Sequence, residues 1–258
     1  MVRSLYTAYT GMRNEEKRLD VISNNMANSN TNAYKAEGST ARAFSEVYGV
    51  KINDDTEANA QRGIGKMSLG VRIGETYRNW QTGSFRETGN TYDFALSGDG
   101  FFTISMTDKS GQEHIRYTRD GSFISTADGY LVTKDGDYVL DDSGEPIQMP
   151  TDQGVPVVDE DGNLTVNGEQ IAKIGIVDFE DYDYLEKYGE NLYDAVDGAT
   201  QKKSTAGILQ GVIETSNVSI VDEMVNMISV TRAYETNQKM IQTVDNMLDK
   251  AVNTVGRL

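Results

Sequence analysis

Residues 217–255 read NVSIVDEMVNMISVTRAYETNQKMIQTVDNMLDKAVNTV, and they set the longest element that this chain can form. The stretch contains neither Gly nor Pro, the two residues that most disfavour a helix interior. Asn217 or Ser219 can cap its start, and two acidic residues follow in the first turn, where the helix dipole favours negative charge. The pattern predicts a helix from about residue 218 to residue 254, roughly 55 Å long at about 1.5 Å per residue.

Two adjacent rows of mostly apolar side chains run along this predicted helix. The first row comprises Ile220, Met224, Met227, Thr231, Tyr234, Gln238, Ile241, Asp245, Leu248, Val252 and Val255. The second row comprises Val230, Ala233, Asn237, Met240, Val244, Met247 and Ala251. The methionines among them fit an adaptable binding groove, but at helical spacing such residues more often pack into a core.

A second helix is predicted at the N-terminus, from Ser4 to about Asn28. Its apolar positions alternate by three and four residues, with Glu15 as the exception, and are Leu5, Ala8, Met12, Leu19, Ile22 and Met26. This helix has one row over some 25 residues, so it cannot cover the longer helix. Roughly 18 Å of length and one whole row stay unpaired, and a monomer rarely exposes that much apolar surface. We therefore expect other copies of the chain, or another protein, to cover it.

An asparagine cluster ends the N-terminal helix. Residues 20–37 read DVISNNMANSNTNAYKAE and contain Asn24, Asn25, Asn28, Asn30 and Asn32 with no Cys or His. Asparagine does not ionise at useful pH and is a weak metal ligand, so chemistry is an improbable reason for the cluster. An amide both donates and accepts hydrogen bonds, and can therefore satisfy backbone groups without placing charge inside a structure.

The middle of the chain, from about Phe44 to Leu209, reads as β-structure. Short alternating runs such as FFTISM (101–106) and NLTVN (163–167) are separated by turns rich in Asp-Gly pairs, which favour hairpins. No helical period of ten residues separates these runs, so an antiparallel arrangement is favoured over a parallel α/β sheet.

Charge is concentrated in the same middle region. The chain has a net charge of −16, and residues 51–206 carry 14 Lys/Arg against 29 Asp/Glu, so both ends are close to neutral. Near-neutral ends are typical of packed interfaces, and an acidic middle is typical of a solvated surface. The balance argues against nucleic acid and anionic membranes as partners. The chain has no Cys and no apolar run long enough to span a membrane.

Three motifs that resemble chemical sites have simpler explanations. His114, the sole histidine, lies in a strand-like run and would have to carry a catalytic or metal site alone. Asp159, Asp161 and Gly162 resemble half of a calcium loop but lack its first and last ligands, so a hairpin turn is favoured. AQRGIGKMS (60–68) lacks two defining positions of a phosphate loop. Paired acidic residues remain open, because the sequence does not show their separation in space.

Five stretches in order along the chain resemble one known family. They are SNNMANSNTNAYK (23–35), TGSFRETGNTYDFALSGDGFFTI (82–104), YTRDGSF (117–123), GENLY (189–193) and ETSNVSIVDEMVNMISVTRAYETNQKMI (214–241), the last including Arg232–Glu235. Together they resemble the bacterial flagellar rod and hook proteins, and they span nearly the whole chain.

The resemblance implies an axial component of the flagellum, exported unfolded through its type III apparatus. It implies helical homo-oligomers with both terminal helices in the inner layers and the β-domain outside. Implied partners are other rod proteins, the hook protein, surrounding rings or a bushing, and the export apparatus. The size and the stretch 42–69 fit a distal rod protein, but RAFSEVYGVKINDDTEANAQRG (42–63) departs from the expected hydrophobic pattern, so a proximal rod protein remains open.

We therefore predict an α+β fold in which the terminal helices pair as a coiled-coil-like α-domain beside a central antiparallel all-β domain. The expected parts are residues 1–41 as helix and Asn-rich joint, 42–82 as an extended connection, 83–209 as the outer β-domain and 210–258 as the helix that packs on the first. The expected assembly interface comprises Leu5, Met12, Leu19, Ile22, Asn24, Asn25, Met26, Asn28, Thr31, Tyr34, Met224, Met227, Arg232, Tyr234, Ile241 and Leu248.

The leading hypothesis is a structural rod subunit without catalytic residues, cofactor or metal. Two hypotheses from other classes are a secreted, carbohydrate-acting β-domain enzyme with acidic catalytic residues, and a monomeric module whose Met-rich helix docks a partner helix.

Overall fold

The chain forms two compact units, each built from segments that are far apart in the sequence. A computed structural model describes residues 2–50, 63–107, 111–150, 154–189 and 191–255. Unit 1 comprises residues 1–27, 36–79 and 219–258, and unit 2 comprises residues 28–35 and 80–218. The chain therefore passes from one unit to the other four times. The predicted α+β class, with a helix at each end and a β-rich middle, is confirmed.

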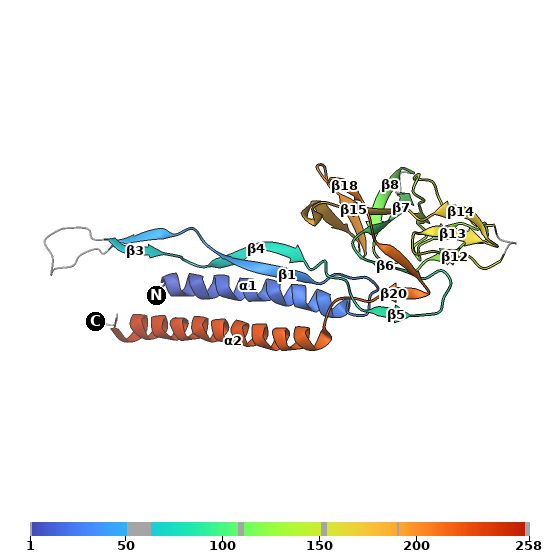
Figure 1. Cartoon of the computed structure of the whole chain (residues 1–258). Coiled ribbons are helices and arrows are strands. Elements are labelled where there is room, and N and C mark those ends of the chain that lie inside the picture. Colours follow the sequence, from blue (N-terminus) through green and yellow to red (C-terminus); the bar gives the residue numbers. More distant parts are fainter. Residues whose placement is uncertain (1, 51–62, 108–110, 151–153, 190, 256–258) are drawn as a thin grey trace. The chain divides into compact units, whose positions relative to one another are not determined.

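Two long helices form one side of unit 1. Helix α1 (Val2–Ala27) and helix α2 (Ile220–Lys250) run antiparallel and pack side by side, and a π-helical turn (Ala251–Val255) extends α2 (Figure 1). Ser219 caps α2, because its side chain accepts a hydrogen bond from the Asp222 N–H at 3.4 Å. Gly11 brings the two helices close together, since a Cβ at this position would lie 3.0 Å from Asn237 Nδ2.

The least exposed row of α2 differs from both predicted rows. It alternates by four and three residues and comprises Glu223, Met227, Val230, Tyr234, Asn237, Ile241, Val244, Leu248 and Ala251. From Met227 onward, the members of this row alternate between the first and the second predicted row, whereas Glu223 belongs to neither. The facing row of α1 is the predicted one, with Glu15 included: Leu5, Ala8, Met12, Glu15, Leu19, Ile22 and Met26 are all buried or half-buried.

Two antiparallel strand pairs complete the described part of unit 1. Strand β1 (Glu37–Ala43) pairs with β4 (Val71–Arg78), and β2 (Val47–Val50) pairs with β3 (Gly63–Met67), both antiparallel. Both β1 and β4 pack on α1 (Figure 1). The stretch expected to be extended, residues 42–82, is thus largely strand where it is described, and residues 51–62 lie outside the described residues. Residues 60–62, at the start of the stretch that resembled a phosphate loop, also lie outside the described residues.

Unit 2 is built from antiparallel strands. The strands that carry its largest sheet are β7 (Phe101–Thr107), β8 (Glu113–Thr118), β9 (Ile124–Ser125), β10 (Leu131–Val132), β11 (Tyr138–Val139), β15 (Ile176–Phe179), β16 (Leu185–Tyr188), β17 (Leu192–Ala195) and β18 (Gln201–Lys203). Their order is β16-β17-β8-β7-β11-β10-β9, and β15 pairs with both β7 and β18. A short 3-10 helix, η1 (Tyr182–Tyr184), precedes β16.

Three smaller sheets complete the described part of unit 2. One has the order β12 (Val157–Val158), β13 (Asn163–Val166) and β14 (Glu169–Lys173). The other two are pairs: β6 (Phe94–Ser97) with β19 (Gly207–Gln210), and β5 (Phe85–Glu87) with β20 (Val212–Glu214). All the strand pairs are antiparallel, as the sequence predicts.

Strand β7 lies between two hydrophobic clusters, because its successive side chains point to opposite faces. Phe102 packs into the larger cluster with residues such as Phe123 and Leu164. Phe101 packs into the smaller cluster, where its ring centroid lies 5.6 Å from that of Trp80, the only tryptophan in the chain. A strand buried on both faces fixes the centre of unit 2.

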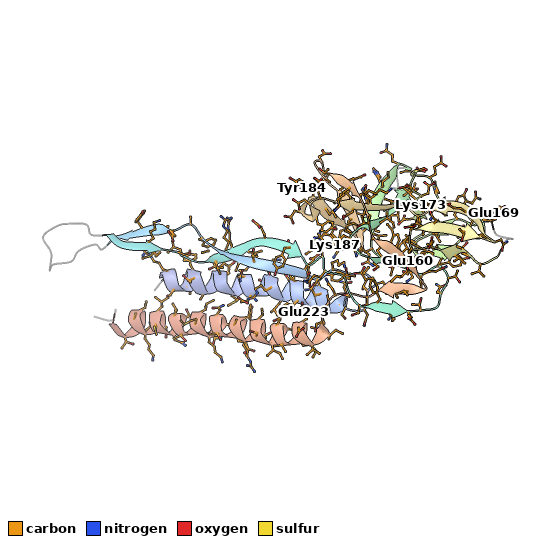
Figure 2. All side chains as sticks on the ribbon, viewed as in Figure 1. Glu160, Glu169, Lys173, Tyr184, Lys187 and Glu223 are labelled. Atoms are coloured by element: carbon orange, nitrogen blue, oxygen red, sulfur yellow. The ribbon has the colours of Figure 1, made fainter. Side chains whose placement is uncertain are left out.

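Acidic side chains are exposed on unit 2, in agreement with the charge distribution. Glu160 and Glu169 are both exposed, and Figure 2 shows Glu169 projecting outward from β14. The turn that resembled half a calcium loop joins β12 to β13, with the Gly162 N–H donating to the Asp159 carbonyl oxygen at 2.9 Å. The hairpin interpretation of this motif is confirmed.

Candidate assembly surfaces and joint residues

The outer side of α2 exposes a large apolar surface. Eight of its residues, or of the turn that extends it, are between 42% and 71% exposed: Ile220, Val221, Met224, Val225, Ile228, Met240, Met247 and Val252. Val221, Val225 and Ile228 follow the spacing of one helical face. A surface helix normally carries polar residues on its outer side, and a contiguous apolar area marks an interaction site. The two predicted rows did not contain these three residues, although their spacing is visible in the sequence.

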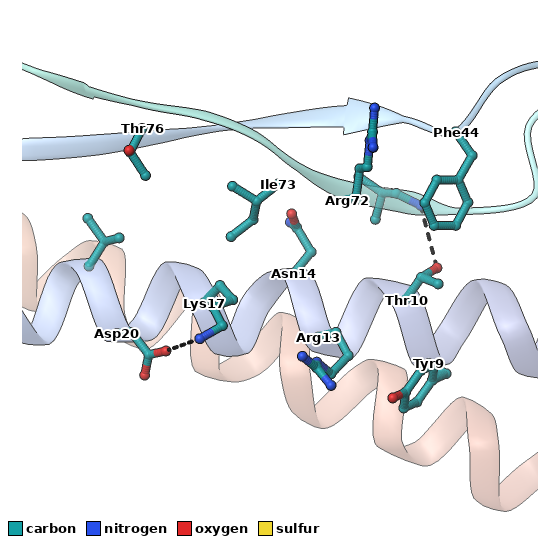
Figure 3. Close-up of a pocket in the computed structure, with 12 residues that line it drawn as sticks. Tyr9, Thr10, Arg13, Asn14, Lys17, Asp20, Phe44, Arg72, Ile73 and Thr76 are labelled. Atoms are coloured by element: carbon teal, nitrogen blue, oxygen red, sulfur yellow. Dashed lines mark hydrogen bonds and ion pairs between the residues drawn. The ribbon is translucent and has the colours of Figure 1, made fainter.

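A groove of about 590 Å³ lies beside α1 within unit 1, lined by both helix and strand residues (Figure 3). Its helix side includes Tyr9, Thr10 and Asn14, and its strand side includes Phe44 and Ile73. The side chain of Asn14 points toward the strands, and the residue is only 5% exposed. Among the described residues, its Oδ1 atom has no hydrogen-bond donor.

Asn25 joins three elements of unit 1. Its Nδ2 donates to the Glu37 carbonyl oxygen at 2.8 Å, and its Oδ1 accepts from the Glu37 N–H at 3.0 Å, so the amide pairs with the first residue of β1 as a neighbouring strand would. Nδ2 also donates to Glu223 Oε1 at 3.1 Å. Glu223 lies in the first turn of α2, where Figure 2 labels it. The residue is 1% exposed. One amide therefore connects the last turn of α1 to β1 and to α2.

The asparagines that follow belong to unit 2. Asn28 closes a turn, because its carbonyl oxygen accepts from the Thr31 N–H at 3.2 Å and its Oδ1 accepts from the Thr31 hydroxyl at 3.2 Å. The Asn32 carbonyl oxygen accepts from Asn191 Nδ2 at 2.9 Å. Asn24 is exposed. The cluster therefore divides between the two units, between Ala27 and Asn28.

The residues predicted for an assembly interface fall into three groups in the described structure. The first group lies in the contact rows of the two helices and comprises Leu5, Met12, Leu19, Ile22, Met26, Met227, Tyr234, Ile241 and Leu248. The second group is Asn24, Met224 and Arg232, which are exposed. The third is Asn25, Asn28, Thr31 and Tyr34, which take part in contacts at the chain crossings or within unit 2. Tyr34 is 2% exposed, and Lys187 Nζ lies 4.7 Å from the centroid of its ring.

The described residues contain no cluster typical of a metal centre. His114 is half-buried in β8, as expected for a strand residue. Within the described part of the chain, no group of three or more His, Cys, Asp or Glu side chains is placed to hold a metal ion. Neither of the described helices combines the length and the apolarity needed to cross a membrane.

Three protein-family models match separate parts of the chain. They are the flagella basal body rod protein model over residues 5–35, the flagellar hook protein FlgE/F/G D1 domain model over residues 95–166, and the flagellar basal body rod FlgEFG protein C-terminal model over residues 209–254. The first covers most of α1 and the asparagine cluster, the second most of the centre of unit 2, and the third all of α2.

Similarity to characterised relatives extends over the whole chain. The flagellar basal-body rod protein FlgG of Bacillus subtilis is 34% identical, with 98% of this chain and 99% of that protein covered. The flagellar basal-body rod protein FlgF of Mesorhizobium japonicum is also 34% identical, with 99% of each covered, and FlgF of Caulobacter vibrioides is 32% identical over both full lengths. The chain belongs to the flagellar basal-body rod protein family, and is a structural subunit of the rod in the flagellar basal body rather than an enzyme.

Proposed function

We propose that this chain self-assembles helically through α1 and α2 and so forms part of a torque-transmitting shaft. Membership of the rod family implies assembly with other rod and hook components. The observation that supports self-assembly is the exposed apolar surface of α2, since eight apolar side chains on one helix require a covering partner. A surface on one side of a subunit that fits a different surface of the next copy generates an open helix, which is the symmetry that a shaft requires.

The pairing of α1 with α2 supports the same proposal. Both contact rows alternate by three and four residues, which is the spacing of a coiled coil, and we propose that the pair forms the coiled-coil-like core of each subunit. The predicted interface residues in these rows would then stabilise the subunit itself. Met224 and Arg232, which lie outside the contact row, would meet the neighbouring subunits, together with Val221, Val225 and Ile228.

We propose the distal rod as the position of this subunit, because its length and the long stretch 42–69 fit that position best. The proximal rod is the second candidate, since relatives named FlgG and FlgF are both 34% identical to this chain. Expression in strains that lack FlgG or FlgF distinguishes the two positions, because motility should return only in the strain whose missing subunit this chain replaces. On the family resemblance, we also propose export in an unfolded state through the flagellar type III apparatus.

A pair of double variants tests self-assembly. V225D/I228D places two charges in the exposed apolar surface, and N226D/S229D places two charges at exposed polar positions of the same helix. We expect the first variant to stay monomeric in sedimentation velocity and to form no filaments in electron micrographs, with its helical circular dichroism unchanged. The second variant should assemble like the wild type. Filaments formed equally well by V225D/I228D would contradict the proposed surface.

A further inference from the structure

Three charged side chains, Lys35, Arg119 and Glu214, are buried together in unit 2 and belong to neither of its two hydrophobic clusters. Lys35 Nζ lies 2.7 Å from Glu214 Oε1, and Arg119 Nη1 lies 3.4 Å from Glu214 Oε2. The three side chains are 1%, 3% and 0% exposed for Lys35, Arg119 and Glu214. Such residues are almost never fully buried unless they are paired, so the network has a specific reason to persist.

The network lies where the chain leaves unit 2. Lys35 is the last residue of unit 2 before the second crossing, and its Nζ also donates to the carbonyl oxygen of Gln81 at 2.9 Å, immediately after the third crossing. The same Gln81 oxygen accepts from Asn217 Nδ2 at 3.0 Å, just before the fourth crossing. The Lys35 ammonium group and the Gln81 carbonyl oxygen thus connect the chain segments beside three of the four crossings, which we call the exits of unit 2.

Backbone contacts strengthen these connections. The Ala33 N–H donates to the Glu214 carbonyl oxygen at 2.9 Å, and the Asn217 N–H donates to the Tyr34 carbonyl oxygen at 3.3 Å. The Gly83 N–H donates to Glu214 Oε1 at 2.8 Å, and only glycine fits there, since a Cβ would collide with the carbonyl oxygen of Thr215. The turn of residues 28–31 follows the first crossing and belongs to the same segment, residues 28–35, that ends at Lys35.

A buried ion pair is a poor source of net stability. Desolvation costs nearly as much as the charges gain from each other, and replacement of both partners by groups of similar size is often neutral. Burial lowers the pKa of Lys35, while the contact with Glu214 opposes this shift. What such a pair does supply is a fixed geometry, because each charge is tolerated only where its partner is in place.

We propose that Lys35, Glu214 and Arg119 are positioning residues that hold the exits of unit 2 in one rigid arrangement. The four crossings are covalent connections between the units, so they carry load from one unit to the other. Since the network connects the exits to one another, the four chain segments share that load, and no single segment acts as a flexible linker. This role rests on the function of the chain as a rod subunit and assigns new residues to it.

The full-length K35M/R119M/E214Q variant tests this proposal. The substitutions remove all three charges of the network, so that no buried charge loses its partner, and keep an oxygen at position 214 for the Gly83 N–H. R116M/D194N is the matched control, because it removes the 2.7 Å ion pair between β8 and β17, far in sequence from every crossing. Trp80 fluorescence during urea unfolding measures the stability of unit 2, and amide exchange measures local opening at residues 28–35, 81–84 and 214–218. Swimming speed in media of rising viscosity measures function under load.

For K35M/R119M/E214Q we expect an unchanged unfolding midpoint, exchange about tenfold faster at the three exits and no change in β7. Swimming should slow more than in the wild type as load rises, whereas the control should show neither effect. Failure of the variant to fold, or equal acceleration at the exits and in β7, would show a stabilising role and overturn the proposal. Unchanged exchange at the exits, or unchanged swimming under load, would also overturn it. A wild-type chain that fails to restore motility would instead count against the position assigned in the rod.

Discussion

Replacement of Asn25 by Ala removes a joint of unit 1 without touching its apolar rows. The substitution leaves the Glu37 N–H and carbonyl oxygen without the partners that now lie 3.0 and 2.8 Å away. A buried polar group without a partner costs about 1–3 kcal/mol, and Glu37 is partly exposed, so each group falls in the lower half of this range. We expect the free energy of unfolding of unit 1 to fall by about 2–4 kcal/mol.

Replacement of Asn25 by Asp separates hydrogen bonding from shape. The new carboxylate can still accept from the Glu37 N–H, but its second oxygen faces the Glu37 carbonyl oxygen and the Glu223 carboxylate instead of donating to them. Both neighbours disfavour the charged form, so the pKa of the introduced carboxyl is raised in the folded state. A raised pKa costs nothing below the unfolded value near 4 and destabilises increasingly above it. The loss of stability in N25D should therefore shrink as the pH falls from 7 to 4, whereas that of N25A should not.

Urea unfolding followed by circular dichroism at 222 nm measures this effect, because α1 and α2 supply nearly all of the helix in the described structure. Ser23→Ala is the control, since Ser23 is an exposed neighbour on the same helix. Trp80 fluorescence from the same samples reports unit 2, which should unfold at an unchanged midpoint. If N25A and S23A unfolded at the same urea concentration, Asn25 would not be a joint and the reasoning would be wrong.

Three further predictions concern unit 2 and use Trp80 fluorescence as the readout. Gly121→Ala should destabilise the unit by about 3 kcal/mol or more, because the added Cβ collides with the Phe94 carbonyl oxygen and breaks a 2.9 Å hydrogen bond between the two backbones; wild-type stability would refute the close approach. Phe101→Ala should cost about 3–5 kcal/mol, because this fully buried ring leaves a cavity, and a smaller loss would indicate that the aromatic cluster collapses around it. Burial alone would raise the pKa of Asp178, but hydrogen bonds from Tyr182, Lys202 and the Phe179 N–H outweigh burial and lower that pKa. The ionised carboxylate therefore stabilises the fold at pH values above the usual Asp pKa of about 3.9, and this stabilisation is lost as the pH falls through the lower pKa of the folded state. Asp178→Asn should therefore be less stable than the wild type at pH 7 but approach it at pH 3, and a constant difference would contradict this.

The elements of this fold follow from local patterns in the sequence, but the face of α2 that packs inside the subunit does not. Its two helices, its antiparallel strands and its Asp-Gly hairpins were all predictable, because each depends on residues close in the chain. Apolar content placed Met240 and Met247 in the predicted rows of α2 and left Glu223 out of both. The structure exposes the two methionines, whereas Glu223 lies in the least exposed row. A helix whose outer face is also apolar gives no signal that separates the face inside the subunit from the face that meets a partner.

The joint residues show a different limit of prediction. The asparagine cluster pointed to hydrogen bonding at a junction, and Asn25 does connect three elements there. Its partners could not be read from the sequence, since Glu223 lies 198 positions away, and neither could the pairing of Lys35 with Glu214, 179 positions away. Burial of a charge depends on what the whole unit brings together, and no local spacing encodes it.

The division of each unit among distant segments governs when the chain can fold. Helix α1 lacks its packing partner until α2 is present, and unit 2 lacks strand β20 and the Glu214 contact until residue 214 is present. A chain delivered with its N-terminus first would therefore close unit 2 only after residue 218 has emerged and unit 1 only after α2 has followed, because contacts between distant segments form only after long loops close. A chain shortened before α2 would leave unit 1 open, although it contains every segment of unit 2.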